Sequence, residues 1–386
     1  MIRFLGLNIP SILAKFLFLV ISANIFTDAN FSQFLAIQVL SGLFVTLGLS
    51  GRDVMIINGK KENAVSRLAE VAVEASVISL TLVLVSVWLA KVEQPLLLWI
   101  ALVASELVIA CLLVLSRSFQ DNKFYIFIQT LRALLPLVFL ILVVFVWPSY
   151  EGSHAAAIVV VANVVTVVVL GNRWVRKLTS VKRIKIFRRD ATNRLILPSA
   201  SSRVQSSLDV ILVTSSSLVH ASSSELFHFA LAARLASNVL IIENLQRAFF
   251  QKKISNWIDD GSFINAAKVL KQVCFMNFVL LAVCVMCFVF FESSLNKYLF
   301  TRFEANAVFI VAFLAKTALL LSAASGLYLP KFGAEKFMLT LDCSGILCLV
   351  TAAVFVDDLQ VFLLVALVLN LLIAGLRFGR LYQNVR

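Results

Sequence analysis

The sequence predicts an all-α membrane protein with about twelve transmembrane helices. The chain of 386 residues is 61% hydrophobic and only 14% charged, with a mean hydropathy of +0.96, whereas soluble domains are about 45–50% apolar and about 25% charged. The apolar residues form runs long enough to cross a bilayer, and the basic residues gather in alternate connections between these runs. Lipid is therefore expected to be the solvent for much of the surface.

The apolar runs fall into two sets of six. A bilayer core of about 30 Å takes about twenty helical residues to cross. We expect the first run to be a retained helix, because no small-residue cleavage site follows it. The predicted spans are 8–26, 34–51, 69–90, 95–116, 124–147, 155–171, 195–217, 225–247, 270–291, 305–328, 337–356 and 359–376. They define an N-terminal lobe, 1–171, and a C-terminal lobe, 195–386, joined by a basic linker, 172–194.

The distribution of Lys and Arg predicts the topology. If the N-terminus is cytoplasmic, the inner connections hold 26 basic residues and the outer connections hold 3. By the positive-inside rule, both termini are then cytoplasmic. This asymmetry also explains the net charge of +13, so nucleic acid is not expected as a partner. The linker is interpreted as a topology determinant, with binding of anionic lipid head groups as the alternative.

Motifs for catalysis or metal binding are weak. Cys284 and Cys287 form a C-x-x-C pair in an apolar run, without a second pair nearby. His154, His220 and His228 have no ligand spacing, and there is no glycine-rich phosphate loop. We therefore predict no enzyme activity, no metal and no cofactor.

Five basic residues lie inside the predicted spans. Each would cost about 2.5–3.5 kcal/mol at the centre of a lipid-facing helix. One interpretation is that they pair with buried acids and hold helices together, as Glu106 and Arg132 on neighbouring spans could do. The other is that they line a cavity for an anionic passenger, for which phosphate is the obvious group. The five are Lys15, Arg132, Arg203, Arg234 and Lys316.

The seventh span, 195–217, is unusually polar. It carries nine Ser or Thr residues together with Arg203, Gln205 and Asp209, and only a narrow apolar stripe remains for lipid. Most of its perimeter is expected to face other helices or water, and we favour a cavity lining. Asp209 is a candidate for coupling to a proton or sodium gradient, with an ion pair to Arg203 or Arg234 as the alternative.

Two stretches resemble polysaccharide flippases of the Wzx type. The opening, IPSILAKFLFLVISANIFTDANFSQFLAIQVLSGLFVTLGLSGRDVMI, is similar to their first two helices. The stretch from LPSASSRVQSSLDVILV to LQRAFFQKKIS is similar to the start of their second half. Each half opens with Pro-Ser at the same distance before a cation, Lys15 or Arg203. The family belongs to the superfamily of multidrug, oligosaccharidyl-lipid and polysaccharide exporters (MOP).

The resemblance implies a MATE-like, V-shaped bundle with a central cavity, working by alternating access in the bacterial cytoplasmic (inner) membrane. The passenger would be an undecaprenyl-diphosphate-linked oligosaccharide for O-antigen or capsule. The partners would be the bilayer, a polysaccharide polymerase and a chain-length regulator. Cavity positions that fit are Lys15, Arg52, Arg203 and Arg234. The chain is short for the family, which counts against the lipid II branch.

Taken with the cations inside the spans, the predicted substrate site comprises Lys15, Arg52, Arg132, Arg203, Arg234 and Lys316. Asp209 and Glu106 are the candidates for ion coupling. The main rival is a MATE-like small-molecule exporter driven by a proton or sodium gradient. A cavity for cationic drugs should be acidic, whereas the residues here are basic. A membrane enzyme ranks third, because the outer connections are short.

Overall fold

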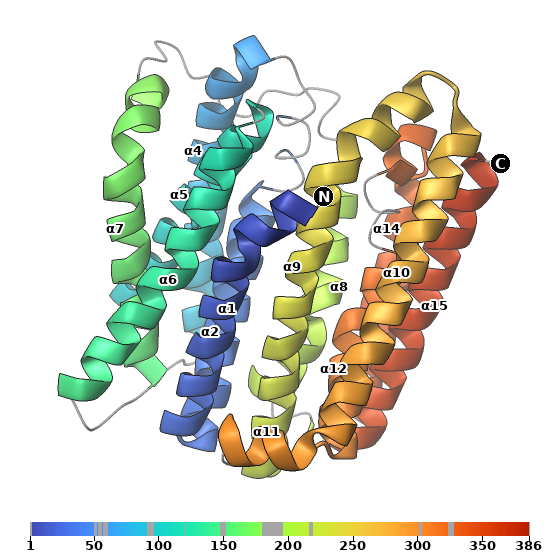
Figure 1. Ribbon diagram of the computed structural model, residues 1–386. Coiled ribbons are helices and arrows are strands. Elements are labelled where there is room, and N and C mark those ends of the chain that lie inside the picture. The colour runs from blue at the N-terminus through green and yellow to red at the C-terminus, as the bar shows by residue number, and fades with distance from the viewer. Residues whose placement is uncertain are drawn as a thin grey trace. The chain divides into compact units, whose positions relative to one another are not determined.

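The computed structural model describes residues 2–49, 52, 56, 61–90, 96–119, 121–146, 152–179, 196–215, 219–300, 303–322 and 328–385. These residues are almost entirely helical, and each predicted span overlaps a helix (Figure 1). In the predicted span 305–328, the α-helix covers only Ala307–Thr317 and a 3₁₀ helix follows to Ser322. The all-α membrane fold class is thus confirmed. Most of the predicted linker, residues 180–194, lies outside the described residues. The cytoplasmic location of the two termini stays a prediction.

The chain divides into two compact units. The N-terminal unit comprises Ile2–Phe18 and Gln33–Arg203, and the C-terminal unit comprises Leu19–Ser32 and Val204–Arg386. The end of the first helix and the start of the second therefore pack with the C-terminal half of the chain. The change from one unit to the other at Arg203 falls inside a helix, nine residues beyond the end of the predicted linker.

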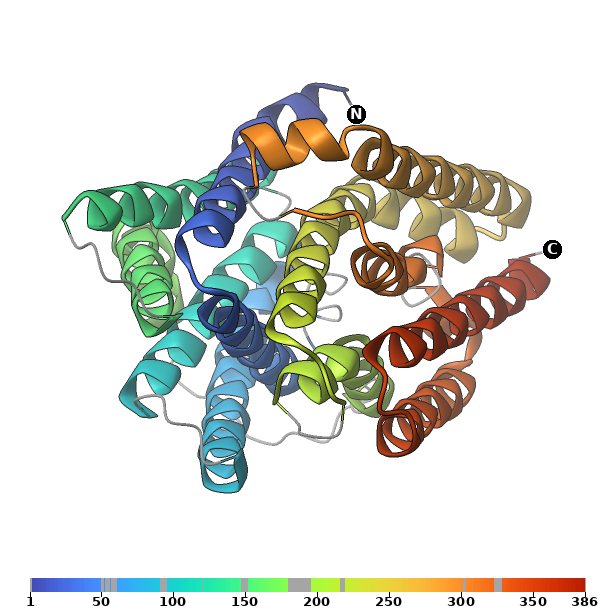
Figure 2. The same cartoon turned by 90° about the horizontal axis from the view of Figure 1, so that it is seen from below.

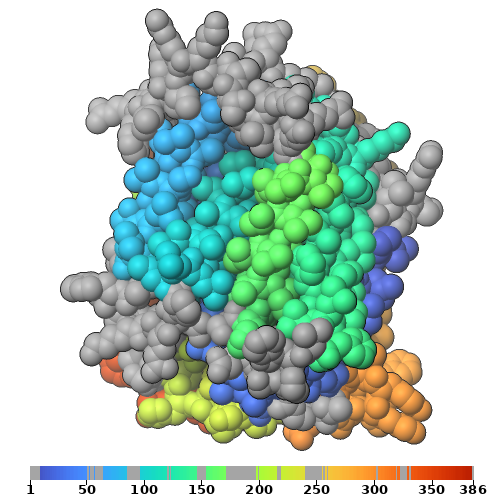
Figure 3. Space-filling view, turned by 90° about the vertical axis from the view of Figure 1, so that its left-hand side faces the viewer, coloured from blue at the N-terminus to red at the C-terminus, as the bar shows by residue number. Residues whose placement is uncertain are grey.

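The N-terminal unit is built from antiparallel neighbours in sequence. Helix α5 contacts α4, α6 and α7, and α6 also contacts α7. Figure 3 shows α4, α5, α7 and α6 side by side on one face of this unit. The helices of this half are α1 (Ile2–Ile25), α2 (Asp28–Leu49), α4 (Lys61–Ala90), α5 (Leu96–Ser118), α6 (Asn122–Val146) and α7 (Gly152–Thr179).

The C-terminal unit is arranged around α12, which contacts α9, α10 and α15 (Figure 2). The helices of this half are α8 (Ile196–Ser215), α9 (Ser223–Asp259), α10 (Phe263–Phe290), α11 (Glu292–Tyr298), α12 (Ala307–Thr317), α14 (Glu335–Phe355) and α15 (Leu359–Val385). Helix α12 continues as a 3₁₀ helix, η2 (Ala318–Ser322), and a second one, η3 (Leu329–Phe332), precedes α14.

Several helices begin at a polar side chain that caps them. A side-chain oxygen at such a position accepts a backbone N–H that has no partner within the helix. Ser222 and Glu225 form a reciprocal capping box at the start of α9, with Ser222 N donating to Glu225 Oε2 at 2.8 Å and Glu225 N to Ser222 Oγ at 3.3 Å. Single caps are provided by Thr27, Asp121, Asn306 and Asp358.

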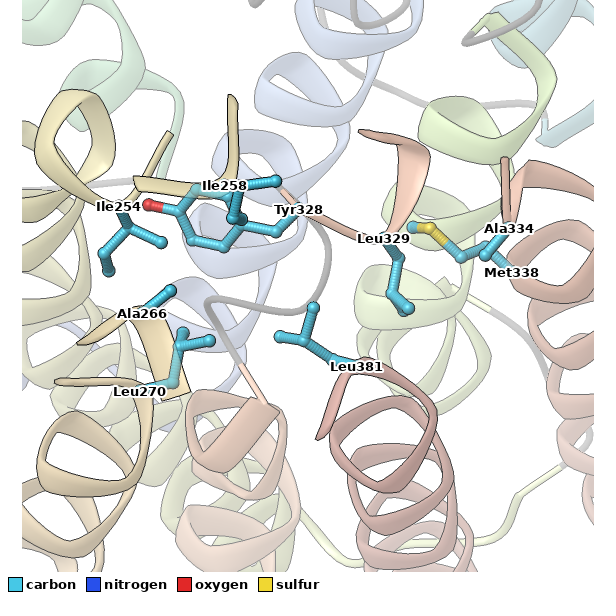
Figure 4. Packing of buried hydrophobic residues seen from close by; sticks show 9 residues of the cluster. All are labelled: Ile254, Ile258, Ala266, Leu270, Tyr328, Leu329, Ala334, Met338 and Leu381. Atoms are coloured by element: carbon cyan, nitrogen blue, oxygen red, sulfur yellow. The ribbon is translucent and has the colours of Figure 1, made fainter. Parts of the chain in front are cut away.

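Among the described residues, six helices are long and apolar enough to cross a membrane, namely α2, α5, α6, α10, α14 and α15. Shorter apolar segments lie in α1, α7 and α12. Helix α9 has 37 residues and is about 55 Å long, which exceeds the bilayer core. One end of the C-terminal unit has an apolar cluster, in which Ile258 of α9, Leu270 of α10 and Leu381 of α15 pack around Tyr328 (Figure 4).

Candidate functional site

Helix α8 has a buried polar face. Ser201, Gln205 and Asp209 are spaced by four residues, so they lie on one side of the helix. All three are buried, and Gln205 is only 1% exposed. The prediction that the polar perimeter of this helix faces other helices holds for these residues. A buried polar face needs partners on the neighbouring helices, because each unpaired polar group is costly in such surroundings.

The carboxylate of Asp209 pairs with the ammonium of Lys316, in the last turn of α12. Lys316 Nζ also donates to the carbonyl oxygen of Ser206 at 3.0 Å. Both side chains are largely buried, 11% exposed for Lys316 and 4% for Asp209. The alternative interpretation of Asp209, an ion pair with Arg203 or Arg234, was therefore right about an ion pair but wrong about its partner, which comes from α12.

A second polar link lies one turn along the same face of α8. Gln205 Nε2 donates to Asn370 Oδ1 of α15 at 2.8 Å, and Asn370 Nδ2 donates to the carbonyl oxygen of Ala315 at 2.9 Å. Because Ala315 immediately precedes Lys316, the two links close a loop of contacts through α8, α12 and α15. A Cβ atom on Gly345 of α14 would lie 3.4 Å from Gln205 Cγ, so α14 also approaches this cluster closely.

A further buried ion pair ties α14 to α15. Arg377 is 5% exposed and donates to Asp342, which is fully buried. Arg377 was expected just outside the last span, but α15 continues beyond it to Val385. Two cations of the C-terminal unit, Lys316 and Arg377, are thus held by carboxylates of other helices.

The N-terminal unit has a matching pair between α5 and α6. Arg132 donates to Glu106, as predicted from their neighbouring spans. Asn163 of α7 is fully buried and donates to the other oxygen of Glu106 at 3.1 Å and to Ser105 Oγ at 3.2 Å. Three helices therefore converge on one carboxylate, which makes Glu106 the polar centre of this unit.

Lys15 lies at the level of this centre. Ser11 Oγ of α1 donates to the carbonyl oxygen of Gln129 in α6 at 3.2 Å, and the two helices run in the same direction (Figure 1). Lys15 and Arg132 each follow this bond by about one helical turn. The unit therefore brings these two cations to the same depth, close to the middle of α1.

Arg52 is paired as well. It donates to Glu74 of α4 and, at 3.1 Å, to the carbonyl oxygen of Gly48. Glu74 is 5% exposed and was not among the buried acids that we predicted. Its position five residues inside the span 69–90 was the available signal, because a carboxylate there needs a partner.

The other predicted cations differ in exposure. Arg203 is exposed in the first half of α8, whereas Lys15 in α1 and Arg234 in α9 are partly exposed. Of the six predicted substrate cations, the structure thus places Arg52, Arg132 and Lys316 in ion pairs with carboxylates of their own unit. Within the described residues, no group of three or more His, Cys, Asp or Glu side chains could hold a metal ion.

The sequence matches no protein-family model, and the comparison with curated proteins gives no match. Solved structures of similar fold include a MATE transporter in complex with MaD5, with a TM-score of 0.61 and 16% identity over 99% of this chain and 95% of that one. A multidrug resistance MATE family transporter of the MOP superfamily in its inward-facing conformation has a TM-score of 0.58 and 16% identity, over 100% and 94% of the chains. A MOP superfamily transporter from Pyrococcus furiosus has a TM-score of 0.51 and 15% identity, over 99% and 95%.

These likenesses extend over nearly the whole length of both chains, so they concern the complete arrangement of helices and not a shared fragment. At this level of identity they define the fold. The chain therefore has the multi-pass, all-α membrane fold of the MATE transporters of the MOP superfamily.

Proposed function

We propose that the protein is a flippase that moves an undecaprenyl-diphosphate-linked oligosaccharide from the cytoplasmic to the outer leaflet of the bacterial cytoplasmic membrane. This lipid carries the repeat unit of a surface polysaccharide such as O-antigen or capsule. A polysaccharide polymerase and a chain-length regulator would act with it. Transport would proceed by alternating access.

The observation that carries the proposal is the position of Arg203 and Lys15. Arg203 is exposed on α8 and Lys15 is partly exposed near the middle of α1, and these two helices open the two halves of the chain. An exposed cation at that depth is costly against lipid tails, so it is expected to face water or an anionic group. A diphosphate would supply such a group, because Arg and Lys form strong charge-assisted hydrogen bonds with phosphate oxygens.

Three cations of the predicted set also hold helices together in this proposal. Arg52, Arg132 and Lys316 form ion pairs with carboxylates of other helices, which partly neutralise their charge. Arg234 is the third cation that we propose for substrate binding. Asp209 and Glu106 are the carboxylates proposed for ion coupling, and each would have to release its cation to bind a proton or a sodium ion.

The second candidate is a small-molecule exporter. It is favoured by the structural neighbours, one of which is a multidrug resistance transporter. The neighbour from Pyrococcus furiosus is described as having a binding pocket of reverse polarity that suggests a different function. Pocket polarity therefore differs among proteins of this fold, and the basic residues here favour an anionic passenger over a cationic drug.

Transport by purified protein in liposomes tests the proposal. A fluorescent undecaprenyl-diphosphate oligosaccharide is loaded, and its loss from reach of an impermeant glycosidase is timed. A charge-assisted hydrogen bond contributes about 1.5–3 kcal/mol, so we expect Arg203→Ala to slow transport about tenfold to hundredfold. Lys336→Ala, which removes an exposed cation at the start of α14, is the control and should transport like the unmodified protein.

The same liposomes distinguish the rival. Efflux of a fluorescent cationic dye without any movement of the lipid-linked glycan would refute the flippase proposal and support the small-molecule exporter. Movement of the glycan at equal rates in Arg203→Ala, Lys15→Ala and the control would support the flippase function. It would refute the proposal that these two cations bind the substrate.

A further inference from the structure

Helix α10 presents one continuous exposed stripe. Ala266, Leu270 and Leu281 belong to its buried face, which packs inside the C-terminal unit. On the opposite face, exposed residues recur at helical spacing. They are Ile264, Lys268, Lys271, Phe275, Phe278, Ala282, Met286 and Val289. Only 17% of the most apolar stretch of this helix is buried. This is the lowest share among the six helices that are long and apolar enough to cross a membrane.

The stripe changes from basic to apolar at one point. Phe275 is 68% exposed and Phe278 is 61% exposed, and the apolar part continues from there to Val289. From Lys271 to the end of the helix at Phe290 the length is about 29 Å, which equals the thickness of a bilayer core. Lys268 and Lys271 therefore stand at the depth of the lipid head groups, directly above a lipid-exposed face.

The second lysine is held in place by an aromatic ring. Lys271 Nζ lies 4.7 Å from the ring centroid of Tyr382 in α15, within the range of a cation–π interaction. Tyr382 in turn stacks on Phe378, with ring centroids 6.5 Å apart. Because Lys268 and Lys271 are three residues apart, their Cβ atoms are about 5–6 Å apart, which allows both ammonium groups to contact one phosphate.

We propose that Lys268, Lys271 and Tyr382 form a binding site for the phosphate of an anionic phospholipid, whose acyl chains lie along Phe275, Phe278 and the apolar stripe below. The stripe carries two cations and no carboxylate, and the nearest acid along the chain, Asp260, precedes the helix. This excess of positive charge favours a lipid with net negative charge over a zwitterionic one. A bound lipid would fix the outer face of α10 against the bilayer, whatever substrate the protein moves.

Binding of phosphatidylglycerol to the full chain tests this site. Purified protein in neutral detergent is titrated with phosphatidylglycerol or phosphatidylcholine, and bound lipid is counted by native mass spectrometry while Tm is measured in parallel. Each Lys near a membrane surface contributes about 1 kcal/mol to the attraction of an anionic lipid. Lys268→Gln/Lys271→Gln should therefore weaken phosphatidylglycerol binding about thirtyfold, and Lys268→Arg/Lys271→Arg should retain it.

The matched control is Lys336→Gln/Arg380→Gln. It makes the same change in charge at exposed positions of the same unit, on α14 and α15, and should bind phosphatidylglycerol like the unmodified protein. An equal loss of phosphatidylglycerol binding in the two double variants, or no loss in either, would refute a specific site. Such a result would indicate a general attraction of the lipid to a basic surface. A rise in Tm with inorganic phosphate equal to that with phosphatidylglycerol would assign the two lysines to free phosphate and overturn the lipid site.

Discussion

The buried pair between Asp209 and Lys316 allows a sharp test of the C-terminal unit. Replacing Lys316 by Met keeps the length and much of the volume of the side chain but removes its charge. Asp209, whose side chain is 4% exposed, is then left without its counter-ion, and the carbonyl oxygen of Ser206 loses the hydrogen bond from Lys316. Removing one partner of a buried ion pair costs about 3–5 kcal/mol. We expect a decrease of that size in the free energy of unfolding.

The double variant Asp209→Asn/Lys316→Met isolates the electrostatic part of this cost. It contains no buried charge at the site, and replacement of a whole pair by neutral groups of similar volume is often without large effect. We expect its free energy of unfolding to lie within about 1.5 kcal/mol of the unmodified protein. The measurement is reversible unfolding in mixed micelles at increasing SDS, with Lys336→Met as a control at an exposed lysine.

Two outcomes would refute the reasoning. If Lys316→Met lowers the free energy of unfolding by less than about 1 kcal/mol, the effect is only as large as that of losing a solvent-exposed ion pair. This result would contradict the burial of these groups. A double variant no more stable than the single one would show that Lys316 stabilises the unit through contacts other than its charge. Transport by the double variant adds a functional result, since unchanged transport would remove Asp209 from the candidates for ion coupling.

Two further predictions concern packing and helix capping. A Cβ atom at Gly48 would lie 2.5 Å from Ser79 Oγ and 2.8 Å from the carbonyl oxygen of Ala75, so Gly48→Ala should push α2 away from α4 and lower the free energy of unfolding by about 1–3 kcal/mol; an equally stable variant in SDS unfolding would contradict this close approach. Asn306 Oδ1 accepts the backbone N–H of Phe309 at 2.9 Å, and its replacement by Ala should cost about 1 kcal/mol, which Asn306→Ser should largely restore in the same measurement.

The sequence predicted the helices and one of their ion pairs. Hydropathy places each span because about twenty apolar residues in succession have no stable location other than a bilayer or a buried core. The pair between Glu106 and Arg132 was also predictable, since consecutive spans are neighbours and each charge needs a partner. Glu74 could have been found by the same reasoning, because it lies inside a predicted span.

The partner of Asp209 could not be predicted in this way. Two spans, α9 and α10, lie between α8 and α12 along the chain, and periodicity fixes which residues share a face but not which helix that face contacts. Arg203 and Arg234 were closer along the chain, yet α12 contacts both α9 and α15 and presents Lys316 toward α8. The assignment of Leu19–Ser32 to the C-terminal unit depends on tertiary contacts in the same way.

The sequence by itself thus determined that the chain is an all-α membrane protein, where its helices lie, and that cations lie inside its spans. The tertiary structure decided which carboxylates Arg52, Arg132 and Lys316 pair with inside their units. The physical reason is that insertion into a bilayer depends on the composition of each segment alone. An ion pair, in contrast, forms only when packing brings two side chains within about 4 Å, and the rotation and neighbours of each helix set that distance.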